Sequence, residues 1–189
     1  MINSTVSSNS ANCVNGWIIW GSGKLINSTI SNNRAGTFSG FHMLWDGDVI
    51  SSTIAGDNAA QAEAHLIGGS VRLSNTVIAN TALDPGPTCS SSSSVESGGG
   101  NVESPGDDCG LSDPTDQVDI SADFLKLGPL ADNGGPTETH ALLSGSVAID
   151  QIPAVDCVDA DGAPLTTDQR AEPRPGGTLC DVGAFELQP

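Results

Sequence analysis

The chain has 189 residues, and its 23 acidic side chains against 6 lysines and arginines give a formal net charge of −17 at pH 7. This charge excludes the basic face with which proteins bind nucleic-acid phosphates, and it disfavours anionic membrane surfaces as partners. The 23 glycines, 11 prolines and 4% of aromatic residues disfavour a helical bundle and favour strands joined by turns. No apolar run approaches the roughly 20 residues of a membrane-spanning helix, so membrane insertion is not expected.

The first 80 residues contain a repeat. Four segments, which begin at Ile2, Ile26, Ile50 and Leu73, align without gaps, and apolar and polar positions alternate within each of them. This alternation predicts a strand with one buried face. A repeat of about 24 residues with roughly two strands is too short for a βαβ unit, so it predicts one coil of a parallel β-helix.

The repeat also predicts which side chains stack on one another. One buried ladder would contain Ile2, Ile26, Ile50 and Leu73, and a second would contain Val6, Ile30, Ile54 and Val77. A polar ladder at the strand ends, bonded to the turns of the next coil, would contain Asn9, Asn33, Asp57 and Asn80. An outward-facing ladder would contain Thr5, Thr29, Thr53 and Thr76, at spacings of 24, 24 and 23 residues. We interpret the threonines as structural, with ice binding as the alternative.

The pattern divides the chain into three parts. Residues 1–83 are expected to form the coils, and residues 84–120 a Ser/Gly/Asp-rich loop insertion with a short strand near Gly98–Val102. Residues 121–189 would form a final coil and a cap over the open end of the stack, because terminal repeats must hide exposed core and strand edges. The first residues lack the basic start and apolar stretch of a secretory signal, so we expect them to lie inside a longer domain.

Four of the five cysteines flank two loops. The simplest pairing joins Cys89 to Cys109 and Cys157 to Cys180, since neither pair has the spacing or neighbouring histidines of a zinc site. Each disulfide would close a loop of roughly twenty residues and stabilise the fold by about 3 kcal/mol. Disulfides predict an extracellular or periplasmic location. Cys13 remains, and we interpret it as a small buried residue.

The last third of the chain contains a distinctive set of motifs. They are Leu127–Leu142, Gly145–Asp150, Thr167-Asp168-Gln169-Arg170 and Cys180–Glu186. These segments resemble the C-terminal region of bacterial secreted β-helix proteins described as choice-of-anchor Q domain proteins. The resemblance covers nearly the whole chain, although Ala171 stands where a glycine usually follows the arginine. It implies a right-handed parallel β-helix, exported to the cell surface or the medium, and it implies no activity.

Two acidic motifs are candidate sites. Gly106-Asp107-Asp108-Cys109-Gly110 resembles one motif of the polygalacturonase family, in which paired carboxylates cleave a glycosidic bond, but the other motifs of that family are missing from the sequence. We therefore interpret Asp107 and Asp108 as a solvated loop, with catalysis as the alternative. Asp156, Asp159 and Asp161 could supply oxygen ligands to Ca²⁺, the one cofactor considered, or form a simple acidic turn.

Other charged residues of the last third are expected to be structural. Arg170 and Arg174 would form ion pairs in the cap with three acidic residues, namely Asp168, Asp181 and Glu186. His140 is expected to form a local hydrogen bond, because no nucleophile pattern surrounds any histidine.

The sequence thus favours a non-catalytic extracellular or cell-surface β-helix module with a structural or adhesive role. One alternative is a carbohydrate-active enzyme or glycan-binding module on the same fold, motivated by Asp107 and Asp108. Another is a structural protein that self-assembles through exposed coil ends. The expected partners are accordingly an extracellular polysaccharide or further copies of the chain stacked end to end.

Overall fold

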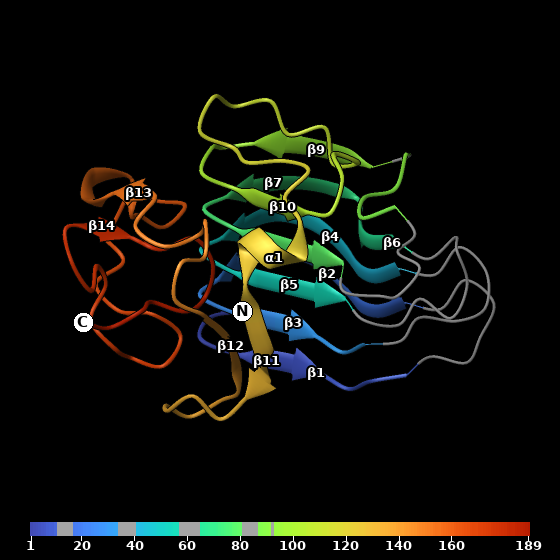
Figure 1. Ribbon diagram of the computed structural model, residues 1–189. Helices are drawn as coiled ribbons and strands as arrows, with labels where there is room; N and C mark the ends of the chain where they lie inside the picture. The colour runs from blue at the N-terminus through green and yellow to red at the C-terminus, as the bar shows by residue number, and fades with distance from the viewer. Residues whose placement is uncertain (11–16, 34–40, 57–64, 81–86, 92) are drawn as a thin grey trace.

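Two parallel β-sheets form the first half of the protein. The computed structural model describes residues 1–10, 17–33, 41–56, 65–80, 87–91 and 93–189. One sheet has the order β1 (Thr5–Ser7), β3 (Thr29–Ser31), β5 (Thr53–Gly56), β8 (Val77–Asn80) and β10 (Val102–Ser104). The other has the order β2 (Trp17–Ile26), β4 (Phe41–Ile50), β7 (Ser70–Ser74) and β9 (Ser94–Ser97), with β6 (His65–Gly68) also paired to β4. The chain alternates between the two sheets, which lie one behind the other in Figure 1.

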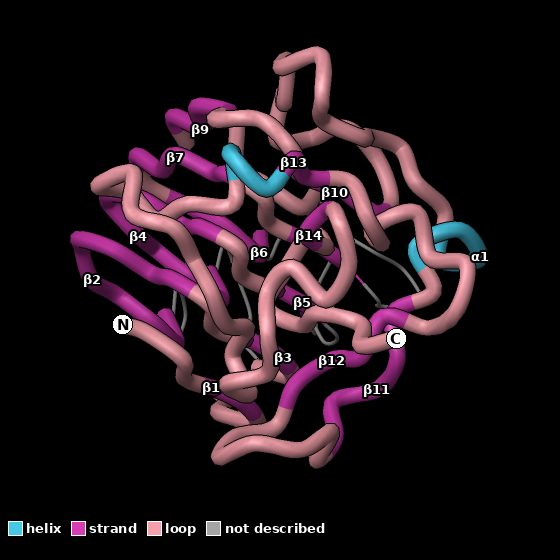
Figure 2. The backbone as a smooth tube through the Cα atoms, turned by 90° about the vertical axis from the view of Figure 1, so that its left-hand side faces the viewer, coloured by secondary structure: helices cyan, strands magenta, loops and turns pink. Residues whose placement is uncertain are grey.

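The second half of the chain contains only short elements. They are α1 (Ala122–Leu125), β11 (Leu127–Ala131), β12 (Thr139–Leu142), β13 (Ile152–Pro153), the 3-10 turn Ala154–Asp156 and β14 (Leu179–Cys180). Both strand pairs here are antiparallel. The β11–β12 hairpin runs across the strands of the β1-to-β10 sheet, and the loops around β13 and β14 lie beside it (Figures 1 and 2). Within the described part of the chain, no helix has the length and apolar character needed to cross a membrane.

The strands of the first four repeats pair at a spacing of 24 residues, whereas β10 pairs with β8 at a spacing of 25, with Val102 beside Val77. Thr5 lies beside Thr29, Thr29 beside Thr53, and Thr53 beside Val77. The sequence alignment, which used a spacing of 23 for the last repeat and placed Thr76 in this column, is therefore wrong by one residue. For the same reason Ile78, and not Val77, continues the ladder of Ile54.

The interior between the two sheets is aliphatic. Leu73 pairs with Val49 and not with Ile50, so the buried ladder here is Leu25, Val49 and Leu73. A second buried ladder contains Ile30, Ile54 and Ile78. Ile26 and Ile50 are buried as predicted, whereas 61% of Ile2 is exposed because it lies on the first strand of the stack.

Residues 121–189 cover the outer face of the β1-to-β10 sheet, which corrects the predicted cap over the end of the stack. Thr29 and Thr53 are 0% and 2% exposed, so the threonine column is not an open surface. The outward positions of later repeats are apolar, as at Val77 and Ala79, and they pack in a second core with residues of the C-terminal part such as Leu142 and Phe185. An apolar outer face must be covered, and this requirement places the C-terminal segment along the side of the stack.

Polar ladders hold the turns of successive repeats together. The Ser4 and Ser28 amides donate to the hydroxyls of Ser28 and Ser52, each over 3.2 Å. A neighbouring column, Asn3, Asn27, Ser51 and Asn75, adopts the left-handed backbone conformation that asparagine tolerates. These contacts satisfy backbone groups where the strands end.

The asparagine ladder predicted at the strand ends is present at its start. The Asn9 side-chain amide donates to Asn33 Oδ1 over 3.0 Å. Asn80, by contrast, lies beside Gly56 in the sheet and not at the position of Asp57. Asp57 itself lies outside the described residues.

The C-terminal part binds the stack through buried polar side chains. Gln169 accepts a hydrogen bond from the Thr29 hydroxyl over 2.7 Å and donates to Thr5 Oγ1 over 2.8 Å. Arg174 donates to Asn27 Oδ1 over 3.0 Å, and the Asn27 amide donates to the Thr167 carbonyl. One segment of chain therefore links two successive repeats through their side chains.

The predicted ion pairs of the cap are confirmed in part. Arg174 pairs with Glu186 at 3.0 Å and Arg170 with Asp168 at 2.8 Å, and all four side chains are almost completely buried. Asp181 joins the group differently, because it accepts hydrogen bonds from the backbone amides of Asp150 and Leu187. Buried charges of this kind are tolerated only when each has a partner.

We predict that Arg174→Leu lowers the free energy of unfolding by about 3–5 kcal/mol, because it leaves the buried Glu186 carboxylate without its cation. Urea unfolding followed by circular dichroism measures this change. Lys24→Met is the matched control, since Lys24 forms an exposed ion pair with Asp161 at 2.6 Å and its loss should leave the midpoint unchanged. Equal losses in the two variants would contradict the proposed dependence on burial.

Candidate functional site

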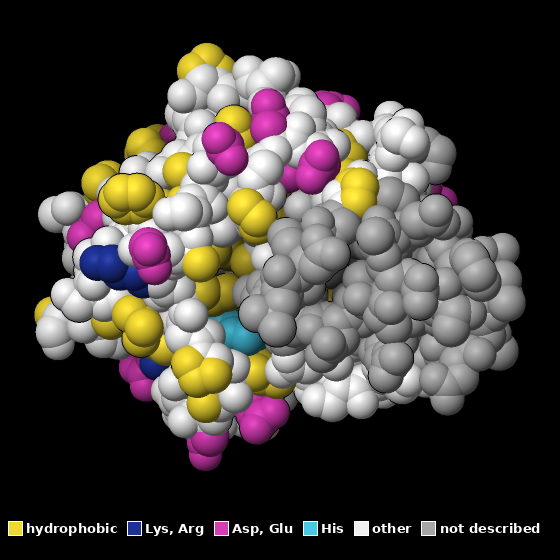
Figure 3. Space-filling model, turned by 45° about the vertical axis from the view of Figure 1, so that its right-hand side comes forward, with side chains coloured by type: hydrophobic (Ala, Val, Ile, Leu, Met, Phe, Trp, Pro, Cys, Tyr) yellow, Lys and Arg dark blue, Asp and Glu magenta, His cyan; other side chains and the backbone are white. Residues whose placement is uncertain are grey.

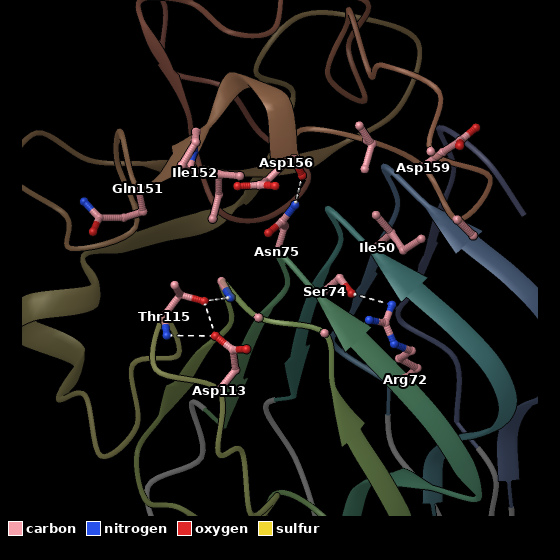
Figure 4. A pocket seen from close by; sticks show the side chains of 17 residues that line it. Ile50, Arg72, Ser74, Asn75, Asp113, Thr115, Gln151, Ile152, Asp156 and Asp159 are labelled. Carbon is pink, nitrogen blue, oxygen red and sulfur yellow. Dashed lines mark hydrogen bonds between the residues drawn. The ribbon is translucent and has the colours of Figure 1, made fainter.

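A groove with a volume of about 520 Å³ lies where the stack meets the C-terminal part. Four segments far apart in the sequence contribute most of its lining: strand β7 with the turn after it, residues 98–100, the loop around Asp113, and residues 151–162; Ile50 of β4 completes it. Figure 4 places Arg72 and Ser74 on one side, Asp113 and Thr115 on the other, and Asp156 above them. The groove exists because the C-terminal part lies along the stack and leaves a gap beside β7.

Three consecutive glycines, Gly98, Gly99 and Gly100, form the floor of the groove. A Cβ atom at Gly98 would lie 2.8 Å from Arg72 Cζ, and one at Gly99 would lie 2.9 Å from Thr115 Oγ1. A side chain at either position would therefore require the groove walls to shift. The sequence led us to expect a short strand that starts at these glycines, whereas the strand in the structure, β10, begins only at Val102 and ends at Ser104.

Hydrogen bonds fix the orientation of Asp113. Its Oδ1 atom accepts from both the hydroxyl and the backbone amide of Thr115, over 2.6 and 2.9 Å. The Thr115 hydroxyl in turn accepts from the Gly100 amide over 2.8 Å. The Oδ2 atom of Asp113 accepts no hydrogen bond from the described residues and remains available to a ligand.

Hydrogen bonds favour the ionised form of two carboxyl groups in the groove, Asp113 and Asp159. The hydrogen bonds from Thr115 lower the pKa of Asp113, and those from the Ala163 and Asp161 amides lower the pKa of Asp159. Arg72 is the one cation among the lining residues, and it also contacts Glu96 at 3.3 Å and Ser74 at 3.4 Å. The groove is thus rich in acceptors, with a guanidinium on one side.

The three aspartates proposed as Ca²⁺ ligands do not gather around one point. Within the described residues, no group of three or more acidic, histidine or cysteine side chains could hold a metal ion. Instead, Asp161 pairs with Lys24, and Asp159 Oδ1 accepts two amides of its own turn. Asp156 and Asp159 both line the groove instead. Acidic side chains on the face in Figure 3 are likewise spread singly.

Asp107 and Asp108 lie exposed in a loop and outside the groove. Beneath them lies Glu103, a fully buried carboxyl group that the sequence analysis missed. Its Oε1 atom accepts from the Asp108 and Cys109 amides over 2.9 and 3.2 Å. Burial raises the pKa of Glu103 to about 7, and the charges of Asp108 and Asp107 add to the effect, against the two amide hydrogen bonds. No sequence signal distinguishes this glutamate from an exposed one.

Asp181 is a second buried carboxyl group with a raised pKa. Burial raises its pKa to about 6, although the amides of Leu187 and Asp150 oppose the shift. Neither Glu103 nor Asp181 lines the groove. Burial thus raises the pKa of Glu103 and Asp181, whereas hydrogen bonds lower the pKa of the groove residues Asp113 and Asp159.

The two disulfides join the pairs expected from the sequence, Cys89–Cys109 and Cys157–Cys180. The first pair belongs to the core between the sheets, and the second to the core beneath the C-terminal part. Cys13 lies outside the described residues, so its predicted burial stays a prediction.

His140 is buried and contacts more than its own neighbourhood. Its Nδ1 atom lies 2.7 Å from the Gly128 carbonyl, as a local role predicts, and its Nε2 atom lies 2.7 Å from Ser31 Oγ in the stack. It therefore ties the β11–β12 hairpin to β3. The side chains of the other two histidines, His42 and His65, lie outside the described part of the structure.

Comparisons of the chain with protein-family models, with curated proteins and with solved structures found no match.

We predict that the protein is more stable at pH 5 than at pH 8. Glu103 binds its proton more tightly in the folded state, with a pKa of about 7 against a reference of 4.5, so the free energy of unfolding falls as pH rises between these values. The loss is about 3 kcal/mol for this group alone, and Asp181 contributes with the same sign. Unfolding measured from pH 4.5 to 8 tests the slope.

Glu103→Gln isolates the effect of this one group. The variant should lose most of the slope between pH 5 and 7, because its amide does not titrate. Glu96→Gln is the control, since that side chain is exposed and should leave the slope as in the original protein. An unchanged slope in Glu103→Gln would show that other groups cause the pH dependence.

Proposed function

We propose that the protein is a non-catalytic β-helix module of a secreted or cell-surface protein, with a structural or adhesive role. The fold proposed is a right-handed parallel β-helix with 24 residues per coil. Its support is the 24-residue register of the first four repeats in two parallel sheets between which the chain alternates. The resemblance of the C-terminal motifs to choice-of-anchor Q domain proteins supports the handedness and the export.

The observation that carries the non-catalytic role is the distribution of the carboxyl groups. Glycoside hydrolysis needs an acid with a raised pKa next to the scissile bond, together with a second carboxylate. In the groove, hydrogen bonds lower the pKa of Asp113 and Asp159. The groups with raised pKa, Glu103 and Asp181, are 0% and 2% exposed and lie elsewhere. Neither of the carboxyl groups with a raised pKa thus reaches the described lining of the groove.

The cross-linked architecture favours a durable extracellular module. The two disulfides fix a loop at the end of the stack and a loop beside the groove, and disulfides of this kind persist in oxidising compartments. The C-terminal part is further held by the buried pair of Arg174 and Glu186. Such a molecule would keep its shape without a partner, as a structural or adhesive module requires.

We predict that the protein releases no sugar from polysaccharides. The test is incubation with neutral, amino-sugar and uronate polymers, followed by assays for new reducing ends and for the unsaturated uronates that a lyase forms. Baseline signals are expected for every polymer. Turnover that disappears in Asp113→Asn but persists in Asp107→Asn would overturn the non-catalytic role and assign catalysis to the groove.

Removal of the Cys157–Cys180 disulfide by the double substitution Cys157→Ser and Cys180→Ser should lower the free energy of unfolding by about 3 kcal/mol, because the open loop gains entropy in the unfolded state. Urea unfolding with and without a reducing agent measures this change. Reduction should destabilise the double variant less than the original protein, because the variant has only the Cys89–Cys109 disulfide to lose whereas the original protein loses two. Equal stability of the oxidised original protein and the double variant would remove the support that this disulfide gives to an extracellular role.

A further inference from the structure

We propose that the groove over Gly98–Gly100 binds an uncharged saccharide through its hydroxyl groups. This inference rests on the proposed non-catalytic function and names the ligand class of an adhesive module.

The shape of the groove suits a small ligand. Its volume of about 520 Å³ lies within the roughly 300–1,000 Å³ typical of ligand sites. Glycine at these three positions lets the side chains of the walls pack directly against the backbone, because a Cβ atom at Gly98 would lie 2.1 Å from Ser74 Oγ and one at Gly100 would lie 2.4 Å from Asn75 Oδ1. The Asn75 amide donates to the Asp156 carbonyl over 2.9 Å and so fixes the wall formed by residues 151–162 relative to the floor. The walls are therefore preformed.

The chemistry of the walls matches hydroxyl groups. Each saccharide hydroxyl can donate one hydrogen bond and accept others, so it can bind both carboxylates and a guanidinium. Asp113 offers Oδ2 with its orientation already fixed, and Arg72 offers donors on the opposite side. The Asp156 carboxylate accepts no hydrogen bond from the described residues and lies above the floor, as Figure 4 illustrates. Charge-assisted bonds of this kind are the stronger ones.

The same walls disfavour anions and metal ions. Three carboxylates against one guanidinium repel an anion such as a uronate, and the net charge of −17 extends that repulsion over the surface. A metal ion is equally disfavoured, because no three acidic side chains of the described chain converge. Ile50, Ile152 and Val158 add apolar surface, which suits the C–H faces of a sugar ring. An uncharged saccharide satisfies all of these conditions.

The test is isothermal titration calorimetry with defined oligosaccharides. The probes are neutral cello-, malto-, xylo-, manno- and galacto-oligosaccharides, with chitosan oligomers and oligogalacturonates as the cationic and anionic comparisons. At least one neutral series should bind, more tightly than the oligogalacturonates. Asp113→Asn should weaken that binding by about tenfold or more, since it removes a charged acceptor and keeps the shape of the side chain.

Asp132→Asn is the matched control. Asp132 also holds a backbone amide two residues further along the chain, that of Gly134, over 3.0 Å, but it lies outside the groove. Its substitution should change binding by less than about twofold, a change too small to reflect a lost charged hydrogen bond. Equal losses in both variants would overturn the assignment of the ligand to the groove. A preference for oligogalacturonate or chitosan oligomers, or no binding to any probe, would overturn the ligand class.

The outcomes separate this inference from the proposed function. Binding of a neutral series together with its cleavage would contradict the non-catalytic role and leave the groove assignment intact. Failure to bind any probe, with baseline reducing ends throughout, would overturn the saccharide site and leave the non-catalytic role untouched. Nuclear magnetic resonance shifts confined to the residues of the groove would give an independent map of the bound ligand.

Discussion

The 24-residue register of the first four repeats is the constraint on which the rest of the structure depends. Because the strands of these repeats lie beside the residues 24 positions away, equal positions stack, and a slip of one residue would turn the aliphatic ladder of Ile30, Ile54 and Ile78 outward. Close contacts between the backbones of neighbouring strands also require this register. A Cβ atom at Gly47 would lie 2.2 Å from the Gly23 carbonyl oxygen in the strand alongside. Side-chain packing and backbone contacts therefore select the same register.

The register also creates the surface that the C-terminal part recognises. Regular stacking brings Thr5 and Thr29 into one column, and Gln169 bonds to both of them. Burial of such polar groups costs free energy unless each finds a partner, so the match between Gln169, Arg174 and the columns gives the docking its specificity. The groove is a consequence, since a segment docked along the side of the stack leaves a gap beside β7.

Much of the architecture could be predicted from the sequence because it repeats locally. The alternation around Thr29 and Thr53 predicted strands and their pairing, and the cysteine positions predicted both disulfides. The fourth repeat was misaligned because Thr76 imitates the threonine column, whereas Val77 occupies it. The apolar residues at outward positions, Val77 and Ala79, are the signal that this face is covered.

The groove could not be predicted in the same way. It joins Arg72, Asp113 and Asp156, which no periodicity relates, and only the docking of short, non-repeating elements brings them together. Burial is equally invisible in the sequence, and it decides the chemistry of each carboxyl group. Burial raises the pKa of Glu103, and it also makes this carboxyl group inaccessible to a ligand. Where hydrogen bonds lower the pKa, as at Asp113, the carboxylate remains reachable and accepts protons poorly. A surface that keeps its reachable carboxylates ionised is suited to holding hydroxyl donors in place and poorly suited to donating the proton that cleavage of a glycosidic bond requires.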